Sequence, residues 1–272
     1  MDFPMTQIGG IPISRLVIGS NTFMGFSHFT SSKDRWLRRY FTVERIVEVL
    51  EYCTEQGLNA ICSGLEDRMY EAMQRQEEKT GRHINWFCTP GGADLAELHQ
   101  GIEKAAQLGA EFCMPHTSWT DARIVVAENR ILDYDEAAKH IRDLGMRPGL
   151  STHRPEAITV GDRAGHDVEV YIQPYNSIGF LCSVETDWVG AVIRGTQKPV
   201  LSIKPLGANR VMPITGLSFV YHSIKPIDTV CIGMLSVEDA DEDIKIARDL
   251  LSGIEAETEL QYTRSKAALV QK

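Results

Sequence analysis

The chain has 272 residues, of which 43% are hydrophobic and 24% charged, with a formal net charge of −9. It is long enough to bury a full core, and the acidic balance argues against a nucleic-acid partner, because phosphate backbones are bound by basic faces. No apolar run is long enough to cross a bilayer, and Met1–Pro4 lacks the basic start of a signal peptide, so we expect neither a membrane protein nor a secreted one.

The N-terminal third begins with a turn signal. Residues 8–19 alternate around Gly9-Gly10, which predicts a small hairpin and then a first strand from Leu16. Residues 21–39 are predicted to be an irregular loop. Thr42 begins a capped helix whose apolar stripe ends at Gly57.

A repeat of short apolar runs and helical patterns follows. The predicted strands are residues 58–62, 84–88, 111–114, 147–151, 168–172, 200–203 and 229–232. The predicted helices are residues 70–79, 94–108, 135–144, 155–162, 184–194, 216–224 and 237–251. Counted from Leu16, this makes about eight strand–helix units, the number that closes a parallel barrel. We therefore expect an α/β (β/α)8 TIM barrel.

The domain organisation is predicted to be simple, because the sequence has no second core and no linker rich in Pro, Gly or Ser. We expect one domain over residues 1–272, with the barrel at about 15–254 and a C-terminal tail at 255–272. An insertion at 119–132 is expected to form a hairpin over the rim. Six scattered cysteines without a Cys-x-x-Cys pair favour reduced thiols, and so a cytoplasmic protein.

The segment Gly149–Glu156 is predicted to be a strand-to-helix corner that ends in Ser-Thr-His. In parallel barrels the carboxyl ends of the strands open onto the ligand, so His153 is a candidate functional residue. A helix-capping role for Ser151 or Thr152, with His153 as a polar rim residue only, is the alternative.

Other polar residues are expected at the same rim. These are Asn21, Glu66, Asp67, Cys88, His116, Gln173, Asn176 and Lys204. Glu66 or Asp67 with His116 and His153 would make a ligand set for a divalent metal. Without a metal, His116 and Asp67 would act as an acid–base pair beside a carbonyl group. Lys204 is a phosphate clamp or a Schiff-base amine in one interpretation and a surface lysine in the other.

Two further sets have a functional and a structural interpretation. Cys62, Cys88 and Cys113 end neighbouring strands, either as a thiolate cluster or as buried apolar thiols. Trp119 and Phe23 would stack on a sugar ring or cover the barrel mouth.

In its motifs the chain resembles the aldo-keto reductases from about residue 7 to 254. The resemblance is carried by the opening hairpin, Gly149–Ile158, Tyr175-Asn176, Lys204-Pro205-Leu206-Gly207 and Ile232–Glu238. It implies a barrel whose floor is closed by the N-terminal hairpin.

The resemblance also implies a divergent member, because the family's catalytic Asp, Tyr and Lys are missing. Cys62 and Asp67 stand where Asp and Tyr would be, and Phe87–Pro90 has no Lys. His116 matches the family's histidine, and Tyr70 is a weak substitute for the Tyr.

For the cofactor, the resemblance implies an NADP site that includes Lys204, Gly233, Ser236 and Asn176. The acids Asp239, Asp241, Glu242 and Asp243 follow this corner and would repel a phosphate, with Lys204 and Arg210 as compensating charges, or they simply cap the helix.

Three functions follow from these residues. The first is a lyase- or isomerase-type enzyme that acts on a small polar carbonyl or sugar-like substrate by acid–base or metal-assisted chemistry, using His116, His153 and Asp67 or Glu66. The second is an NADP-dependent carbonyl oxidoreductase with an atypical proton donor. The third is a non-catalytic ligand-binding protein. A small-molecule partner is expected, and a homo-oligomer is left open.

Overall fold

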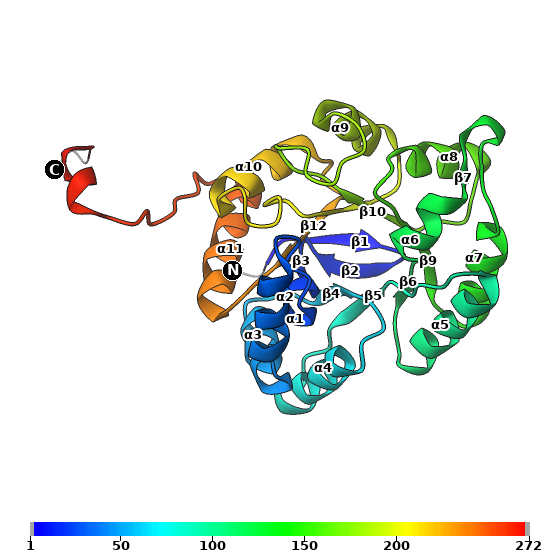
Figure 1. Ribbon diagram of the computed structural model, residues 1–272, viewed down its shortest axis with the longest axis horizontal. Helices are drawn as coiled ribbons and strands as arrows, with labels where there is room; N and C mark the ends of the chain where they lie inside the picture. The colour runs from blue at the N-terminus through cyan, green and yellow to red at the C-terminus, as the bar shows by residue number, and fades with distance from the viewer. Residues whose placement is uncertain (1–2, 270–272) are drawn as a thin grey trace.

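The computed structural model describes residues 3–269 and contains a closed ring of eight parallel strands (Figure 1). The strands, in order around the ring, are β3 (Leu16–Gly19), β4 (Ala60–Ser63), β5 (Asn85–Cys88), β6 (Phe112–Cys113), β9 (Arg147–Ser151), β10 (Val170–Pro174), β11 (Val200–Ile203) and β12 (Thr229–Gly233). β12 pairs with β3 and closes the ring. The predicted (β/α)8 barrel is confirmed. Met1, Asp2 and the last three residues of the predicted tail lie outside the described residues.

Helices cover the outside of this ring (Figure 1). They are α3 (Val43–Glu55), α4 (Asp67–Thr80), α5 (Leu95–Gln107), α7 (Tyr134–Asp143), α8 (Glu156–Ala164), α9 (Thr186–Gly195), α10 (Pro213–Ser223) and α11 (Val237–Leu251). In α3, Ile46, Leu50 and Cys53 are buried at helical spacing, and the Thr42 side chain caps the Arg45 amide. Such stripes place one apolar face against the strands.

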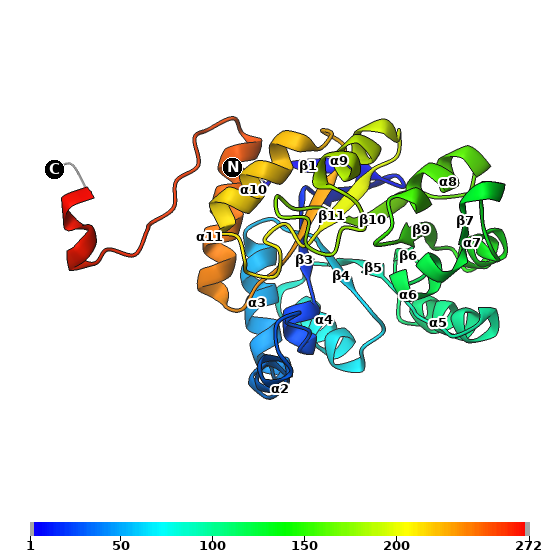
Figure 2. The ribbon, with the colours of Figure 1, turned by 45° about the horizontal axis from the view of Figure 1, so that its top comes forward.

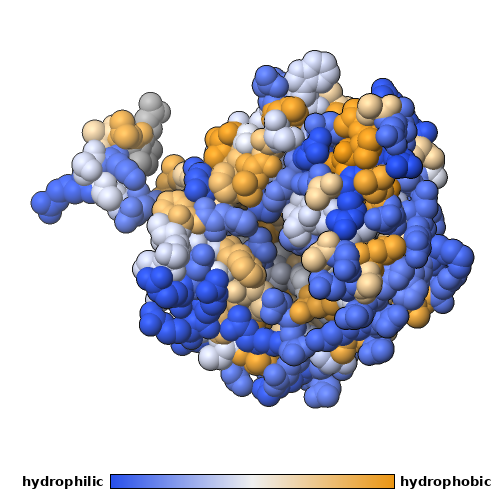
Figure 3. Space-filling view, turned by 45° about the vertical axis from the view of Figure 1, so that its right-hand side comes forward, coloured by the Kyte–Doolittle hydropathy of each residue, from blue (hydrophilic) through white to orange (hydrophobic). Residues whose placement is uncertain are grey.

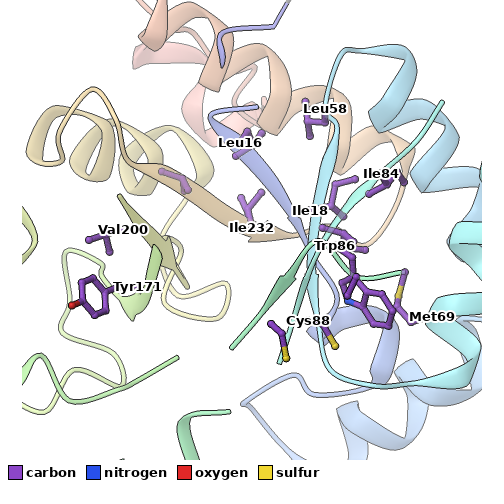
Figure 4. Close-up of a cluster of buried hydrophobic side chains, with 14 of the residues drawn as sticks. Leu16, Ile18, Leu58, Met69, Ile84, Trp86, Cys88, Tyr171, Val200 and Ile232 are labelled. Atoms are coloured by element: carbon purple, nitrogen blue, oxygen red, sulfur yellow. The ribbon is translucent and has the colours of Figure 1, made fainter. Parts of the chain in front are cut away.

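Alternation along the strands divides the buried side chains between two cores. Inside the ring lie residues such as Val17, Ala60, Phe87 and Leu201. Between the ring and the helices lies a larger core, part of which Figure 4 shows, with Ile18, Trp86 and Cys88 among its members. Residues of one strand therefore point alternately into the barrel and toward the helices.

The N-terminal hairpin closes one end of the barrel. β1 (Met5–Ile8) and β2 (Ile11–Ser14) pair in antiparallel register around Gly9 and Gly10, which both have positive φ. Ile8 and Ile13 join the core inside the ring. Arg147, at the start of β9, donates from Nε to the Gly9 carbonyl. In Figure 2 the hairpin and α2 lie at opposite ends of the barrel, so the predicted floor is confirmed.

The segment 21–39 differs from the prediction, because it contains α1 (Asn21–Met24) and α2 (Ser31–Tyr40) rather than an irregular loop. α2 buries only Leu37, so it lacks the apolar stripe that would predict a helix. Interactions at the two ends of α2 explain why this segment is helical. The Thr30 side chain accepts from the Lys33 amide at 3.2 Å, and Arg38 and Arg39 lie in the last turn, where positive charge favours a helix.

The predicted hairpin within 119–132 is present. It follows α6 (Thr117–Thr120) and a short 3-10 helix, Asp121–Arg123, and it pairs β7 (Ile124–Val125) with β8 (Arg130–Ile131). It packs against α8 on the outside of the ring rather than over the mouth (Figure 1).

Beyond α11 the chain leaves the barrel and ends in a 3-10 helix at Arg264–Leu269 (Figures 1 and 2). No helix among the described residues is long and apolar enough to cross a membrane.

Candidate active site

Three strand ends place basic side chains at the mouth of the barrel, the end opposite the hairpin. His116 follows β6, His153 follows β9, and Lys204 directly follows β11. Lys204 has a φ of 61°, a left-handed conformation that is uncommon for a residue with a side chain. The positive charge of Lys204 acts on both imidazoles, which places all three groups at one opening.

Both imidazoles are held in the neutral form. Partial burial, followed by the charge of Lys204, lowers the pKa of His153 to about 4. The same two causes lower the pKa of His116, and Asp121 opposes them in both residues. An imidazole that is neutral at pH 7 is able to accept a proton.

Lys204 has no acidic partner. Across residues 3–269 its ammonium makes no ion pair and no hydrogen bond within the usual limits, although the side chain is half-buried. Burial is the main cause that lowers its pKa, and the nearby thiols Cys231 and Cys62 act in the opposite direction. Buried charges are normally paired, so an unpaired ammonium at this position indicates a functional role rather than a structural ion pair.

The two thiols lie inside the ring, below Lys204. Cys62 of β4 pairs in register with Gly19 of β3, and a Cβ on Gly19 would lie 3.1 Å from the Cys231 Sγ. The absent side chain of Gly19 lets the thiols approach across β3. A hydrogen bond from Cys62, together with burial, raises the pKa of Cys231. Cys88 and Cys113, by contrast, belong to the core between strands and helices, where burial raises the pKa of both thiols, which fits the interpretation of buried apolar thiols.

Asp121 ties the end of β9 to the loop after β6. Its carboxylate accepts from the Thr117 hydroxyl at 2.8 Å, from the Thr152 hydroxyl, and from the His153 amide at 3.1 Å. These bonds fix the backbone that carries both His116 and His153. The sequence prediction missed Asp121 because 119–132 was interpreted as an insertion. Its position five residues after His116 was the available signal.

A third histidine reaches the mouth from the α1–α2 loop. His28 is exposed, its ring lies 6.1 Å from that of Phe180, and its pKa is lowered by burial and then by Lys204. Arg210 holds this loop, because it donates to the His28 carbonyl at 3.2 Å and stacks over Phe180 and Phe29. Arg210 is therefore occupied and is not a free phosphate ligand.

The predicted acids point elsewhere. The Asp67 side chain is 89% exposed and pairs with Lys104 on α5 at 2.8 Å. Glu66 is an exposed residue that precedes α4 and makes no capping bond. Within residues 3–269 no three His, Cys, Asp or Glu side chains are grouped so as to hold a metal ion. The predicted metal set of Glu66, His116 and His153 is therefore not supported among the described residues, because strand ends bring residues to the same rim without turning their side chains inward.

The predicted NADP corner is closed by the chain itself. The Ser236 hydroxyl accepts from the Asp239 amide and the Asp239 carboxylate accepts from the Leu235 amide, both at 3.2 Å. Two amides that would hold a phosphate are thus already occupied, that of Leu235 by a carboxylate and that of Asp239 by a hydroxyl. A Cβ on the neighbouring Gly233 would lie 2.7 Å from the Thr22 hydroxyl.

The side chain of Asn176 is likewise occupied by hydrogen bonds within the chain. It is buried, and both ends of its side-chain amide bond to the Phe180 backbone, at 2.7 and 3.0 Å. Together with the acids that follow Ser236, these contacts do not fit an NADP site.

Three aromatic residues are also unavailable. Trp119 and Phe23 are completely buried, so neither stacks on a ligand. Tyr70 packs near Trp86 in the core between strands and helices.

Comparison with known proteins gives a fold. No protein-family model and no curated protein matches the chain. Gox0644 in its apo form is 12% identical, with a TM-score of 0.60 over 96% of this chain and 97% of that one. An aldo/keto reductase from Klebsiella pneumoniae, solved in complex with NADP and acetate, is 13% identical, with a TM-score of 0.57 over 94% and 98%.

Other barrels match as well. The glycerol dehydrogenase AKR11B4 from Gluconobacter oxydans is 13% identical, with a TM-score of 0.57 over 95% of this chain and 98% of that one. Rubisco from Pyrococcus horikoshii is 12% identical and has a TM-score of 0.51, but only 56% of its chain is covered, against 79% of this one. The chain thus has an aldo/keto reductase-like (β/α)8 barrel, and at these identities the likeness extends to the fold alone.

Proposed function

We propose that this barrel is an enzyme of lyase or isomerase type that moves protons beside the carbonyl group of a small anionic substrate. One observation carries the proposal. Two imidazoles held neutral and one ammonium without an acidic partner share the barrel mouth. Active sites of this barrel architecture lie at that end.

Each basic group has a role in this chemistry. Lys204 draws the negative charge and the carbonyl oxygen of the substrate toward the mouth. His153 accepts a proton from the carbon next to the carbonyl and later returns it to the substrate, while His116 stabilises the enolate oxygen through a hydrogen bond from its ring N–H. General acid–base catalysis by positioned side chains contributes a rate factor of about 10²–10⁴. Asp121 is a positioning residue, and it takes the place that the sequence had assigned to Asp67 or Glu66.

The setting of the enzyme is proposed on similar grounds. All six cysteines are free thiols, which agrees with a reducing compartment, so we propose the cytoplasm. The partner is a small molecule, not nucleic acid or a membrane. Apolar side chains gather in separate patches on an otherwise hydrophilic surface (Figure 3), which is consistent with a homo-oligomer.

Hydrogen–deuterium exchange tests the proposal. The protein is incubated in D2O with pyruvate, oxaloacetate, dihydroxyacetone phosphate or glyceraldehyde 3-phosphate, and loss of the α-proton is followed by NMR. We expect exchange above the buffer rate for at least one compound. H116Q and H153Q should each slow it by about 100-fold or more. H222Q, which changes an exposed histidine on α10, is the matched control.

Three results would overturn the proposal. The first is an exchange rate equal to that of buffer for every compound. The second is saturable binding without exchange, which would favour the ligand-binding protein. The third is quenching of protein fluorescence by micromolar NADPH with oxidation of the nucleotide, which would favour the oxidoreductase.

A further inference from the structure

We infer that the Nζ atom of Lys204 forms a covalent imine with the carbonyl carbon of the substrate. This inference rests on the proposed function, but it adds a bond that acid–base catalysis alone does not need. It assigns the substrate class as aldehydes and ketones that also carry a carboxylate or phosphate.

The surroundings of Lys204 favour nucleophilic chemistry. The side chain is half-buried among two imidazoles and the thiols of Cys62 and Cys231, and no carboxylate of the described residues lies against its ammonium. Lysines that are desolvated or placed beside other basic groups lose their proton more readily and become nucleophiles near neutral pH.

Other lysines show the contrast. Lys225 is also largely buried, but its ammonium pairs with Asp228 at 2.9 Å and donates to the Ile193 carbonyl. Lys79, Lys104 and Lys139 each pair with an acid on the surface. A lysine whose role is structural is thus paired here, and Lys204 is not.

The histidines supply the proton transfers that imine formation requires. The neutral amine of Lys204 adds its electron pair to the carbonyl carbon, and the proton lost from nitrogen passes to one imidazole. The imidazolium passes this proton to the alkoxide oxygen, which completes the carbinolamine. A second proton, taken from solvent by the other imidazole, allows the hydroxyl to leave as water. One carbonyl, one amine and one proton become one protonated imine and one water, so no oxidant or reductant is consumed. The protonated imine draws electrons from the adjacent carbon, where His153 takes up the proton.

Borohydride trapping tests the bond. The full-length protein is incubated with pyruvate and sodium cyanoborohydride, and the product is examined by intact mass and peptide mapping. We expect one reduced pyruvate adduct, in the peptide that contains Lys204. K204R keeps the positive charge but forms no imine, and it should lose the adduct. K225R, at the paired lysine, should keep it. Circular dichroism verifies that both variants fold.

The exchange assay separates this inference from the proposed function. With the imine, K204R slows α-proton exchange by at least about 100-fold although its charge is retained. If no compound gives an adduct and K204R exchanges as fast as wild type, the imine is refuted and the acid–base function stands. If Lys204 is trapped but wild type shows no exchange, the imine stands and the function fails. Adducts spread equally over surface lysines, and unchanged in K204R, would also refute the imine.

Discussion

At the scale of single residues, the main feature of the mouth is the positive charge of Lys204, which no carboxylate among the described residues pairs with. Lys204 lowers the pKa of His28, His116 and His153, and Asp121 only partly opposes this effect on the last two. The Asp121 carboxylate is bound by Thr117, Thr152 and the His153 amide rather than by the Lys204 ammonium. The site therefore combines proton acceptors with a cation, a pairing that attracts anionic carbonyl compounds.

Removal of the Lys204 charge should change the pKa of the neighbouring histidines. In K204M the pKa of His153 should rise from about 4 toward the ordinary histidine value. Burial and the Lys204 charge both lower this pKa, and the substitution removes the charge but leaves the burial. NMR titration of the imidazole resonances measures this shift. K204R keeps the charge and should leave the titration midpoint near that of wild type, so equal midpoints in K204M and wild type would refute the electrostatic account.

The positioning role of Asp121 gives a second prediction. D121N removes a charged acceptor, and hydrogen bonds to charged groups contribute about 1.5–3 kcal/mol, so the free energy of unfolding should fall by a similar amount. The pKa of His153 should fall further, because Asp121 raises it. Urea unfolding and NMR measure the two effects. E128Q alters an exposed acid on the nearby hairpin and should change stability by less than about 0.5 kcal/mol.

Residue identities at the mouth were partly predictable. Position at a strand end located His116, His153 and Lys204, because parallel strands deliver their carboxyl ends to one rim. The same rule also selected Asp67, whose side chain turns outward to Lys104. The rule gives the end of the barrel but not the direction of a side chain in the loop beyond the strand. Asp121 was missed because it begins a short 3-10 helix inside the segment 119–132, whose backbone path the sequence does not specify.

At the scale of elements, the hairpin that closes the floor depends on two glycines with different surroundings. Both have positive φ, 53° at Gly9 and 79° at Gly10. A Cβ on Gly9 would lie 2.4 Å from the Arg147 Cδ, whereas a Cβ on Gly10 would meet nothing within 4 Å. Only Gly9 is therefore required by packing as well as by backbone conformation.

This difference predicts unequal costs for the same substitution. G10A should lower the free energy of unfolding by about 1–2 kcal/mol, the cost of a Cβ in the left-handed region. G9A should cost at least about 1 kcal/mol more, because Arg147 must move off the Gly9 carbonyl. Guanidinium chloride unfolding of the two variants compares them directly. Equal losses would mean that Arg147 adjusts freely.

Elements were more predictable than side-chain directions. The predicted strand 147–151 matches β9, and the predicted helix 237–251 matches α11, because both carry a clear apolar pattern and a defined end. α2 was missed because its cap and charges, rather than apolar periodicity, hold it. Local hydrogen bonds of this kind leave only a weak trace in a sequence read for hydrophobic spacing.

At the scale of the whole molecule, charge is unevenly distributed. The chain is acidic overall, yet the mouth carries the ammonium of Lys204 beside neutral imidazoles, while acids gather at the start of α11. A basic opening in an acidic protein directs anionic ligands to one place. Closure of the ring explains why such distant residues meet, since β3 pairs with β12 across almost the entire barrel sequence.

The acids of α11 give a prediction for the stability of the whole fold. Asp243 is buried with one carboxylate oxygen unpartnered, and burial, then Asp239 and Glu242, raises its pKa to about 8. It also faces Cys53 of α3 and Tyr221 of α10, and it raises the pKa of both. The folded protein therefore retains a proton on this carboxyl that the unfolded chain releases near pH 4.

Because the folded state binds more protons, stability is full below about pH 4 for this group and falls as the pH rises toward 8. Wild type should lose more than about 2 kcal/mol of unfolding free energy across this window, since each unit of pKa difference corresponds to about 1.4 kcal/mol. D243N cannot ionise and should lack this decline, whereas D187N, at an exposed position on α9, should retain it. Urea unfolding at intervals between pH 5 and 8.5 measures the slopes, and parallel slopes for D243N and wild type would show that Asp243 is ionised in the folded state throughout.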